Sequence, residues 1–306
     1  MNTPKKMSIR PARNDYVIRA TAADGFVRAF AVTAAGVTEE ARTRHGLSPV
    51  ASAALGRTMS AALMMGYDLK NKDDLLTIQF AGDGPIGGIT VTADSKGTVK
   101  GYVQQPLVLL PPNAKGKLDV SGAIGAGILT VISDTGLKEP YVGQVELVSG
   151  EIAEDIAYYY ASSEQVPSSV GLGVLVNPDS TVNCAGGFII QLMPGCPEET
   201  ISVLEECMKG VTGVTDILKE GKTAEEMLRG LLAPLDPVVT DTTDCSYYCN
   251  CSRERVSRAL MTVGEKELRS MISDGKPVEL SCHFCGKSYT FSVKDLERML
   301  KTGGAS

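Results

Sequence analysis

Two pairs of cysteines near the end of the chain have a spacing that suits a metal ion. One residue separates Cys249 from Cys251, two separate Cys282 from Cys285, and 30 lie between the pairs. Four thiolates in two close pairs can close a tetrahedral zinc site and leave no position for water, which is the structural rather than the catalytic pattern. The sequence therefore predicts one Zn²⁺ per chain, bound by Cys249, Cys251, Cys282 and Cys285.

The other thiols suggest no site of their own. The chain has 8 cysteines and 2 histidines. Three scattered thiols are most simply buried or incidental, since a free cysteine behaves as a small hydrophobe; they are Cys184, Cys196 and Cys207. Cys245 is surplus to four ligands but close enough in sequence to compete with Cys249. His283 could replace a ligand, although four cysteines already suffice.

The composition indicates an ordinary folded protein. Of 306 residues, 43% are hydrophobic and 22% charged, and the net charge is −6, so no overall basic field would collect nucleic acid or anionic lipid. The N-terminus lacks the apolar run of a secretory signal, which predicts a cytoplasmic protein. The most apolar run, residues 49–67, is interrupted by Arg57 and predicts a buried helix rather than a membrane span. Eight cysteines in a reducing compartment do not indicate a disulfide framework.

Changes in composition predict an α+β protein in several parts. Residues 1–14 form an N-terminal extension, and residues 15–195 form a glycine-rich core of alternating strands and helices. Residues 196–243 form an acidic, amphipathic helical linker with ten acids against four Lys and Arg. Residues 244–306 form a small C-terminal zinc domain, with strands near 278–282 and 288–292 and a terminal helix from Val293.

The linker carries apolar residues at helical spacing. Thr223 and Glu226 fit a capping box, whereas glycines and Pro234 divide the segment into short helices, which are marginal without a packing partner. We expect its order to depend on its neighbours. The apolar residues at this spacing are Ile201, Leu204, Met208, Met227, Leu228, Leu231 and Leu232.

Several alternative functions have weaker support. Gly82–Gly87 matches G-x-G-x-x-G, but a strand follows it instead of the helix that a dinucleotide site requires. A zinc-ribbon module for nucleic acid could use Arg253, Arg255 and Arg258. However, residues 244–306 hold ten Lys or Arg and eight Asp or Glu, which is nearly neutral. A thiol oxidoreductase using Cys282 and Cys285 would normally place this motif at the start of a helix.

Zinc bound next to a marginal linker suggests a role beyond stabilising a small domain. The C-x-C spacing permits a disulfide between near neighbours that should be strained and hence labile. Zinc can contribute on the order of 10–16 kcal/mol to the folding of a small domain. Oxidation of the thiolates would therefore remove most of what keeps the C-terminal domain ordered.

The sequence resembles the redox-regulated thirty-three-kilodalton heat-shock chaperones. The likeness runs from about Asp15 to Val293 and includes "RHGLSPVASAALGRTMSAALMMG", "GDGPIGGITVTAD" and "AGGFIIQLMPGC", followed by both cysteine pairs. The resemblance implies a holdase without enzymatic activity, which is inactive when reduced and zinc-bound. Oxidation would form Cys249–Cys251 and Cys282–Cys285 disulfides, release zinc and unfold the C-terminal domain and linker.

The resemblance also implies partners. The oxidised protein would hold unfolding client proteins without ATP and would form a homodimer. On this resemblance we predict that the apolar linker residues named above act as the switch and bind the clients. Reduction would then prepare the clients for ATP-dependent refolding chaperones. No membrane partner is expected, and the local charge argues against nucleic acid.

Overall fold

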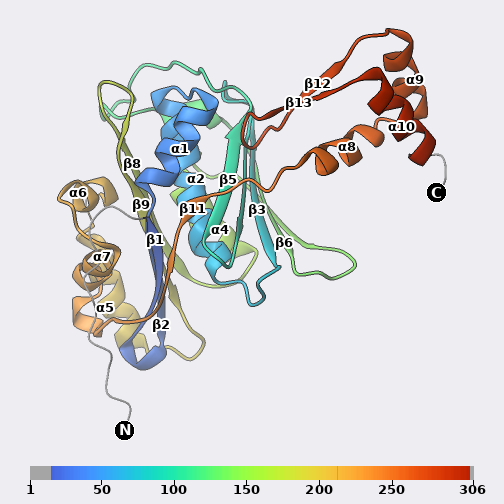
Figure 1. The fold of residues 1–306 in the computed structure, drawn as a ribbon. Coiled ribbons are helices and arrows are strands. Elements are labelled where there is room, and N and C mark those ends of the chain that lie inside the picture. Colours follow the sequence, from blue (N-terminus) through green and yellow to red (C-terminus); the bar gives the residue numbers. More distant parts are fainter. Residues whose placement is uncertain (1–14, 212, 304–306) are drawn as a thin grey trace. The chain divides into compact units, whose positions relative to one another are not determined.

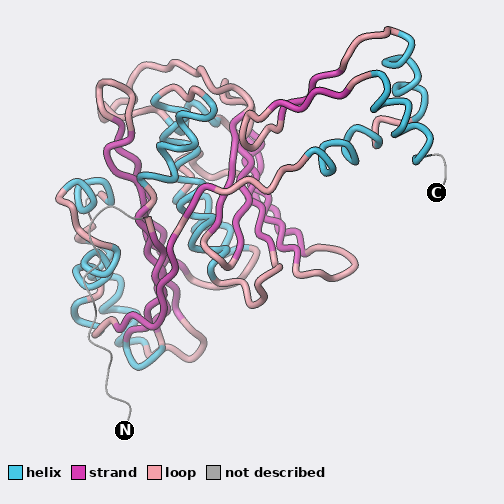
Figure 2. The backbone as a smooth tube through the Cα atoms, in the orientation of Figure 1, coloured by secondary structure: helices cyan, strands magenta, loops and turns pink. Residues whose placement is uncertain are grey.

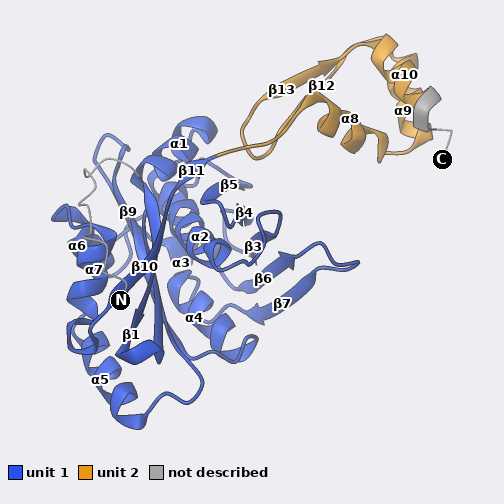
Figure 3. Ribbon diagram, turned by 60° about the horizontal axis from the view of Figure 1, so that its bottom comes forward, with its two compact units in different colours: residues 1–247 blue, residues 248–306 orange. Residues whose placement is uncertain are grey.

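The computed structural model describes residues 15–211 and 213–303, and the chain forms two compact units. Unit 1 is Met1–Tyr247 and unit 2 is Tyr248–Ser306 (Figure 3). The predicted extension, residues 1–14, lies outside the described residues, and the predicted linker segment lies within unit 1. Both units combine strands with helices, which confirms the α+β class.

Unit 1 is built on two sheets (Figure 1; strands are magenta in Figure 2). The first has the order β10-β1-β2-β9-β8 and is antiparallel throughout. Its strands are β1 (Tyr16–Ala22), β2 (Val27–Thr33), β8 (Ser168–Val176), β9 (Val182–Leu192) and β10 (Val238–Asp244). The second has the order β11-β5-β4-β3-β6-β7, in which only the short pair β11–β5 is parallel. Its strands are β3 (Leu75–Gly82), β4 (Ile89–Asp94), β5 (Thr98–Val103), β6 (Gly127–Asp134), β7 (Tyr141–Glu146) and β11 (Ser246–Tyr247).

A buried helix, α2 (Pro49–Tyr67), occupies the space between the two sheets (Figure 1). Every residue from Val50 to Tyr67 except Arg57 is buried, which explains why the sequence is apolar around the whole helix. Ser48 caps its first turn by accepting a hydrogen bond from the Ala51 amide. The predicted buried helix is therefore confirmed. The other helices of the core are α1 (Ala35–His45), α3 (Val120–Ile124) and α4 (Ala153–Ser162), with a short 3₁₀ turn at Ala23–Gly25.

The G-x-G-x-x-G stretch is a connection between strands, as its context predicted. It joins β3 to β4, and a Cβ on Gly84 would collide with the backbone of Ala123 and Ile124. Gly87 has a φ of +71°, a conformation that favours glycine. These glycines serve close packing and a tight turn rather than a phosphate.

Three helices from the predicted linker segment cover the other face of the five-stranded sheet (Figure 1). They are α5 (Glu198–Lys209), α6 (Val214–Lys219) and α7 (Ala224–Leu231), followed by a 3₁₀ turn at Ala233–Leu235. Side chains alternate along a strand, so Val17 of β1 packs toward α2, whereas Tyr16 and Ile18 pack toward these helices. The linker helices thus have a definite partner, the sheet of unit 1.

The predicted linker switch residues are mostly buried against this sheet. Leu204, Met227, Leu228, Leu231 and Leu232 belong to the same buried cluster as Ile18 and Phe188. Met208 is partly buried against it, whereas Ile201 is half-buried and is not among its members. The capping box is present, since Thr223 accepts from the Glu226 amide and the Glu226 carboxylate accepts from the Thr223 amide.

In the described part of the chain, none of the helices combines the length and the apolar character needed to cross a membrane.

Replacing Leu228 with alanine should weaken the attachment of the linker helices. The Leu228 side chain is 1% exposed, and truncating a buried leucine costs about 2–5 kcal/mol of unfolding free energy. Val203→Ala on α5, where the side chain is 36% exposed, is the matched control and should change stability by less than about 0.5 kcal/mol. Denaturant titration of the reduced protein measures both. Equal effects would contradict the packing assigned to α7.

Candidate metal centre

Unit 2 is a hairpin with three helices around a very small core. Its elements are α8 (Arg253–Met261), α9 (Glu265–Ser273), β12 (Val278–Ser281), β13 (Ser288–Phe291) and α10 (Val293–Gly303). The buried residues of this core are Leu260, Leu268, Tyr289, Phe291, Leu296 and Met299. Cys251 and Cys282 pack against its edge. A core of this size contributes little stability, so unit 2 depends on a further source of order.

The second cysteine pair lies in the turn of the β12–β13 hairpin. Cys282 follows β12 directly, and its amide donates to the Lys287 carbonyl at 2.9 Å. The Cys282 carbonyl in turn accepts from the amides of Cys285 and Gly286, and Gly286 has a φ of +70°. This tight turn aims both sulfurs to one side. It does not open a helix, which removes the main support for a thiol oxidoreductase.

The first cysteine pair immediately precedes α8. Ser252 caps that helix by accepting from the Arg255 amide, so the helix begins directly after Cys251. The Cys249 Sγ lies 3.7 Å from the Cys282 Sγ, and the Cys251 Sγ lies 3.4 Å from the Cys285 Sγ. Each cysteine of the first pair therefore has a close sulfur contact with a cysteine of the second.

The four sulfur atoms have the separation that a zinc ion requires. All four Sγ atoms lie within 4.8 Å of one another. Zinc–sulfur bonds of about 2.3 Å to the corners of a tetrahedron place the sulfurs about 3.8 Å apart. All eight cysteines are free thiols, and a set of four soft thiol ligands suits zinc. The centre can therefore bind a metal ion, and its geometry and donor atoms are compatible with zinc.

The surroundings of the thiols make them electrostatically unequal. Burial raises the pKa of Cys249 to about 12 and also raises the pKa of Cys285. Burial acts on Cys251 as well, but hydrogen bonds from Tyr289 and from the neighbouring thiols outweigh it and lower the pKa of Cys251 to about 7. Of Cys249, Cys251 and Cys285, it is therefore Cys251 that most readily provides a thiolate, the form that binds metals and reacts with oxidants.

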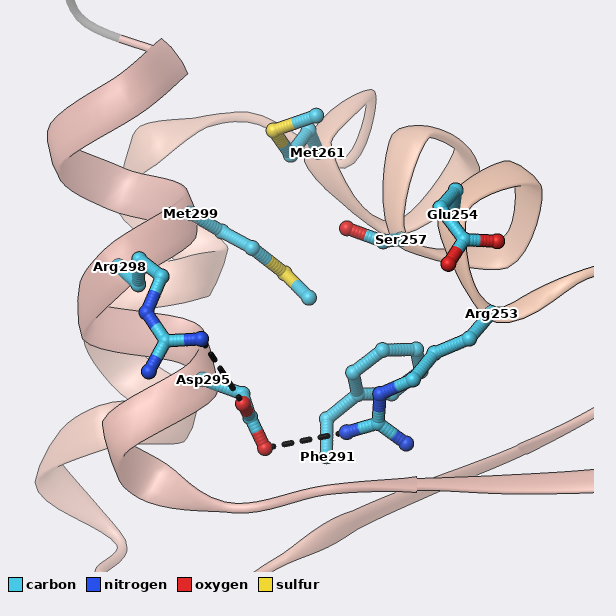
Figure 4. A pocket seen from close by; sticks show the side chains of 8 residues that line it. All are labelled: Arg253, Glu254, Ser257, Met261, Phe291, Asp295, Arg298 and Met299. Atoms are coloured by element: carbon cyan, nitrogen blue, oxygen red, sulfur yellow. Dashed lines mark hydrogen bonds and ion pairs between the residues drawn. The ribbon is translucent and has the colours of Figure 1, made fainter.

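Arg253 fastens the first cysteine pair to the rest of unit 2. Its guanidinium donates to the Thr290 carbonyl at 2.8 Å. It also donates to the Asp295 carboxylate at 3.1 Å and lies 4.5 Å from the centre of the Phe291 ring (Figure 4). These contacts line a pocket of about 250 Å³ in which Arg298 also faces Asp295 at 3.8 Å. Arg253, considered above as a nucleic-acid contact, thus pairs within its own unit.

The other cysteines lie in unit 1. Cys245 packs at the edge of the α2 core, and burial together with Asp15 and Asp244 raises its pKa, so this thiol stays protonated. Cys184 is 8% exposed beneath α6, with its Sγ 3.9 Å from the Thr215 carbonyl. Cys196 and Cys207 are half-buried. The four-thiol cluster forms without Cys245, as the sequence analysis favoured.

The sequence and the fold both match known proteins. A family profile described as Hsp33 protein matches residues 15–292. The chain belongs to the Hsp33 family. A 33 kDa chaperonin of Lachnoclostridium phytofermentans is 53% identical over 287 residues, which cover 94% of this chain and 98% of that protein. A 33 kDa chaperonin of Bacillus subtilis is 48% identical over 284 residues, which cover 92% and 97%.

A solved Hsp33 structure supports the same assignment. The crystal structure of a 33 kDa chaperonin, a heat-shock protein 33 homologue from Thermotoga maritima, superposes with a TM-score of 0.88. It is 39% identical and covers 96% of this chain and 100% of that one. Membership in the Hsp33 family makes the protein a heat-shock chaperone, and its relatives are named as chaperonins rather than as enzymes.

Zinc binding should release protons and should strengthen as pH rises. At about pH 8, Cys249 and Cys285 still carry protons because their pKa values are raised, so binding must displace at least these two. Higher pH leaves fewer protons to displace, and the affinity increases. Calorimetry in buffers of different ionisation enthalpy measures the number released. Cys245→Ser should leave one zinc per chain, whereas Cys249→Ser should weaken binding strongly; the reverse order would show that Cys245 is the ligand.

Proposed function

We propose that this Hsp33 protein is a redox-regulated, ATP-independent holdase whose sensor is the four-cysteine centre. The observation that carries the proposal is the location of four convergent sulfurs against a core that has only six buried residues in the described part of unit 2. Cys249, Cys251, Cys282 and Cys285 would hold one Zn²⁺. When bound, the ion would keep the four sulfurs as thiolates and cross-link the hairpin to the start of α8.

Oxidation would convert the ligands into two disulfides. In each pair, two thiolates and one hypochlorous acid give a disulfide, chloride and hydroxide, so the sulfurs lose two electrons and the chlorine gains them. A disulfide sulfur is no longer an anionic ligand, and the centre can no longer retain the metal. Peroxide with heat would act on the same thiolates. We propose the pairing Cys249–Cys251 and Cys282–Cys285, which the family resemblance implies.

Loss of the metal would unfold unit 2. Metal binding contributes on the order of 10–16 kcal/mol in small zinc domains, more than the total stability of many whole domains. The small core of unit 2 cannot replace a contribution of this size. Oxidation would thus become a folding transition, with the segment from Tyr248 onward as the part that melts.

The linker helices would then separate from the five-stranded sheet. Tyr16 supports this step because it contacts both β10, which leads toward unit 2, and the first turn of α7. Its backbone pairs with Asp244 of β10, and its hydroxyl donates to Glu225 at 2.5 Å. The same hydroxyl accepts from the Ala224 amide at 3.3 Å. Once unit 2 melts, β10 continues into a disordered chain, and fraying of the β1–β10 pairing would disturb the start of α7.

Separation would uncover two apolar surfaces at once. One is the linker face with Leu204, Met227, Leu228, Leu231 and Leu232, together with Met208 and Ile201. The other is the sheet face with Ile18, Phe188 and Ile190. Apolar surface of this extent is a binding site for unfolded chains, and methionine can adapt to many partners. The functional division into residues 15–195, 196–243 and 244–306 forms part of this proposal.

The remaining parts of the proposal concern partners and compartment. The oxidised protein would form a homodimer in the cytoplasm, retain unfolding client proteins and pass them to ATP-dependent refolding chaperones after reduction. It would use no membrane partner and no nucleic acid, since the zinc segment is nearly neutral.

Titrating hypochlorous acid into the reduced, zinc-loaded protein tests the sensor directly. A thermally unfolding client is present and nucleotide is absent. We expect about one zinc to leave per two disulfides formed, as a four-thiolate site requires, and client aggregation to stop in step. Peptide mapping identifies the disulfides, including any Cys251–Cys285 bond between the close sulfurs. Zinc loss without suppression of aggregation would show that the metal centre stabilises unit 2 but does not control client binding.

The thiol of Cys184 reports whether the linker separates. It is buried beneath α6 in the reduced state, so alkylation should be slow there and should accelerate at least about tenfold once oxidation uncovers the sheet. Half-buried Cys196 is the internal reference. Excess oxidant is quenched first, and mass spectrometry measures the label. If Cys184 stays protected while the oxidised protein holds its client, the client surface lies elsewhere.

A further inference from the structure

A tyrosine hydroxyl reaches one of the four cluster sulfurs. The Tyr289 Oη donates to the Cys251 Sγ over 3.1 Å. Tyr289 lies on β13 opposite Leu280 of β12, and its side chain is 7% exposed within the core of unit 2. Lys287 Nζ lies 5.3 Å from the centre of its ring. The core therefore holds the ring in place and directs the hydroxyl at the sulfur.

The inward face of β13 holds the first cysteine pair at two neighbouring points. Tyr289 and Phe291 lie on the same buried face of the strand. Tyr289 contacts Cys251, while Phe291 packs under the guanidinium of Arg253 two residues further along. Residues 251–253 are thus attached to β13 by two hydrogen bonds, Tyr289 to Cys251 and Arg253 to the Thr290 carbonyl, and by one cation–π contact. The hydroxyl contact is the one that reaches a sulfur.

A hydrogen bond to a thiolate has two chemical consequences. It draws electron density from the sulfur, which lowers the nucleophilicity of that sulfur toward an oxidant. It also fixes the position of the sulfur, as outer hydrogen-bond partners do for metal ligands in general. A neutral disulfide sulfur is a weaker acceptor than a thiolate, so oxidation would leave a buried hydroxyl poorly paired, which is unfavourable.

We propose that Tyr289 is a positioning residue of the sensor, holding the Cys251 sulfur in the metal-binding arrangement and restraining its reaction with oxidant. The inference rests on the proposed function and deepens it. Tyr289 also transmits the state of the sulfur, because its ring belongs to the core that must melt. Loss of the thiolate therefore weakens β13 at the same time as it removes a ligand.

The test replaces Tyr289 with phenylalanine, which removes only the hydroxyl. In the cobalt-substituted protein, the sulfur-to-metal charge-transfer band should move to longer wavelength, because a more electron-rich thiolate is easier to oxidise. The zinc dissociation constant should rise about tenfold, and hypochlorous acid should release zinc at lower doses. Tyr248→Phe, one residue from Cys249 and 58% exposed, is the matched control and should change none of these.

Two features of the experiment keep its outcomes distinct. If Tyr289→Phe does not fold with zinc, 4-aminophenylalanine is placed at the same position instead. This side chain retains a donor, so the charge-transfer band of the cobalt-substituted variant should lie close to that of the wild-type protein. An unchanged band and an unchanged zinc affinity in a folded Tyr289→Phe protein would overturn the assignment. Failure of the wild-type protein to hold a client after oxidation would instead overturn the proposed function, while the band and the affinity would still decide on Tyr289.

Discussion

The convergence of four sulfur atoms is the constraint on which unit 2 depends. Two pieces of chain, the turn of the β12–β13 hairpin and the segment before α8, bring their cysteines within 4.8 Å of one another. Uncompensated thiolates at this distance would repel, and thiols alone bond weakly. A divalent ion would resolve both problems, whereas the six buried side chains that the structure describes in this unit could not hold the segments together by burial alone.

The two faces of the five-stranded sheet have different partners. One face packs on α2, a helix that is buried almost throughout, and the other packs on the short helices α5, α6 and α7. Short helices have little stability of their own and rely on the packing of one apolar face. The proposed function therefore assigns separation to this second layer. Its chain continues through β10 and β11 directly into unit 2, so these helices and the cysteine cluster lie close together in sequence.

Some of this arrangement could be predicted from the sequence because it depends on local patterns. The cysteine spacing indicated the cluster, the continuous apolar run indicated α2, and Thr223 with Glu226 indicated the start of α7. The pairing of β1 with β2 was not predicted. The pairing of β1 with β10 could not be predicted, since it joins segments more than 200 residues apart in sequence. Helices α8 and α9 were also missed. The partner of the linker face and the contact between Tyr289 and Cys251 are tertiary facts, which neither periodicity nor spacing encodes.

The central claim is that the metal centre and the linker helices share one transition. Hydrogen exchange, compared between the reduced zinc-loaded protein and the oxidised zinc-free protein, tests it most directly. The account predicts that amides of α8, α9, α10 and the β12–β13 hairpin lose protection together with those of α5, α6 and α7, while α2 and β9 remain protected. Loss of protection in unit 2 with α5, α6 and α7 unchanged would contradict it.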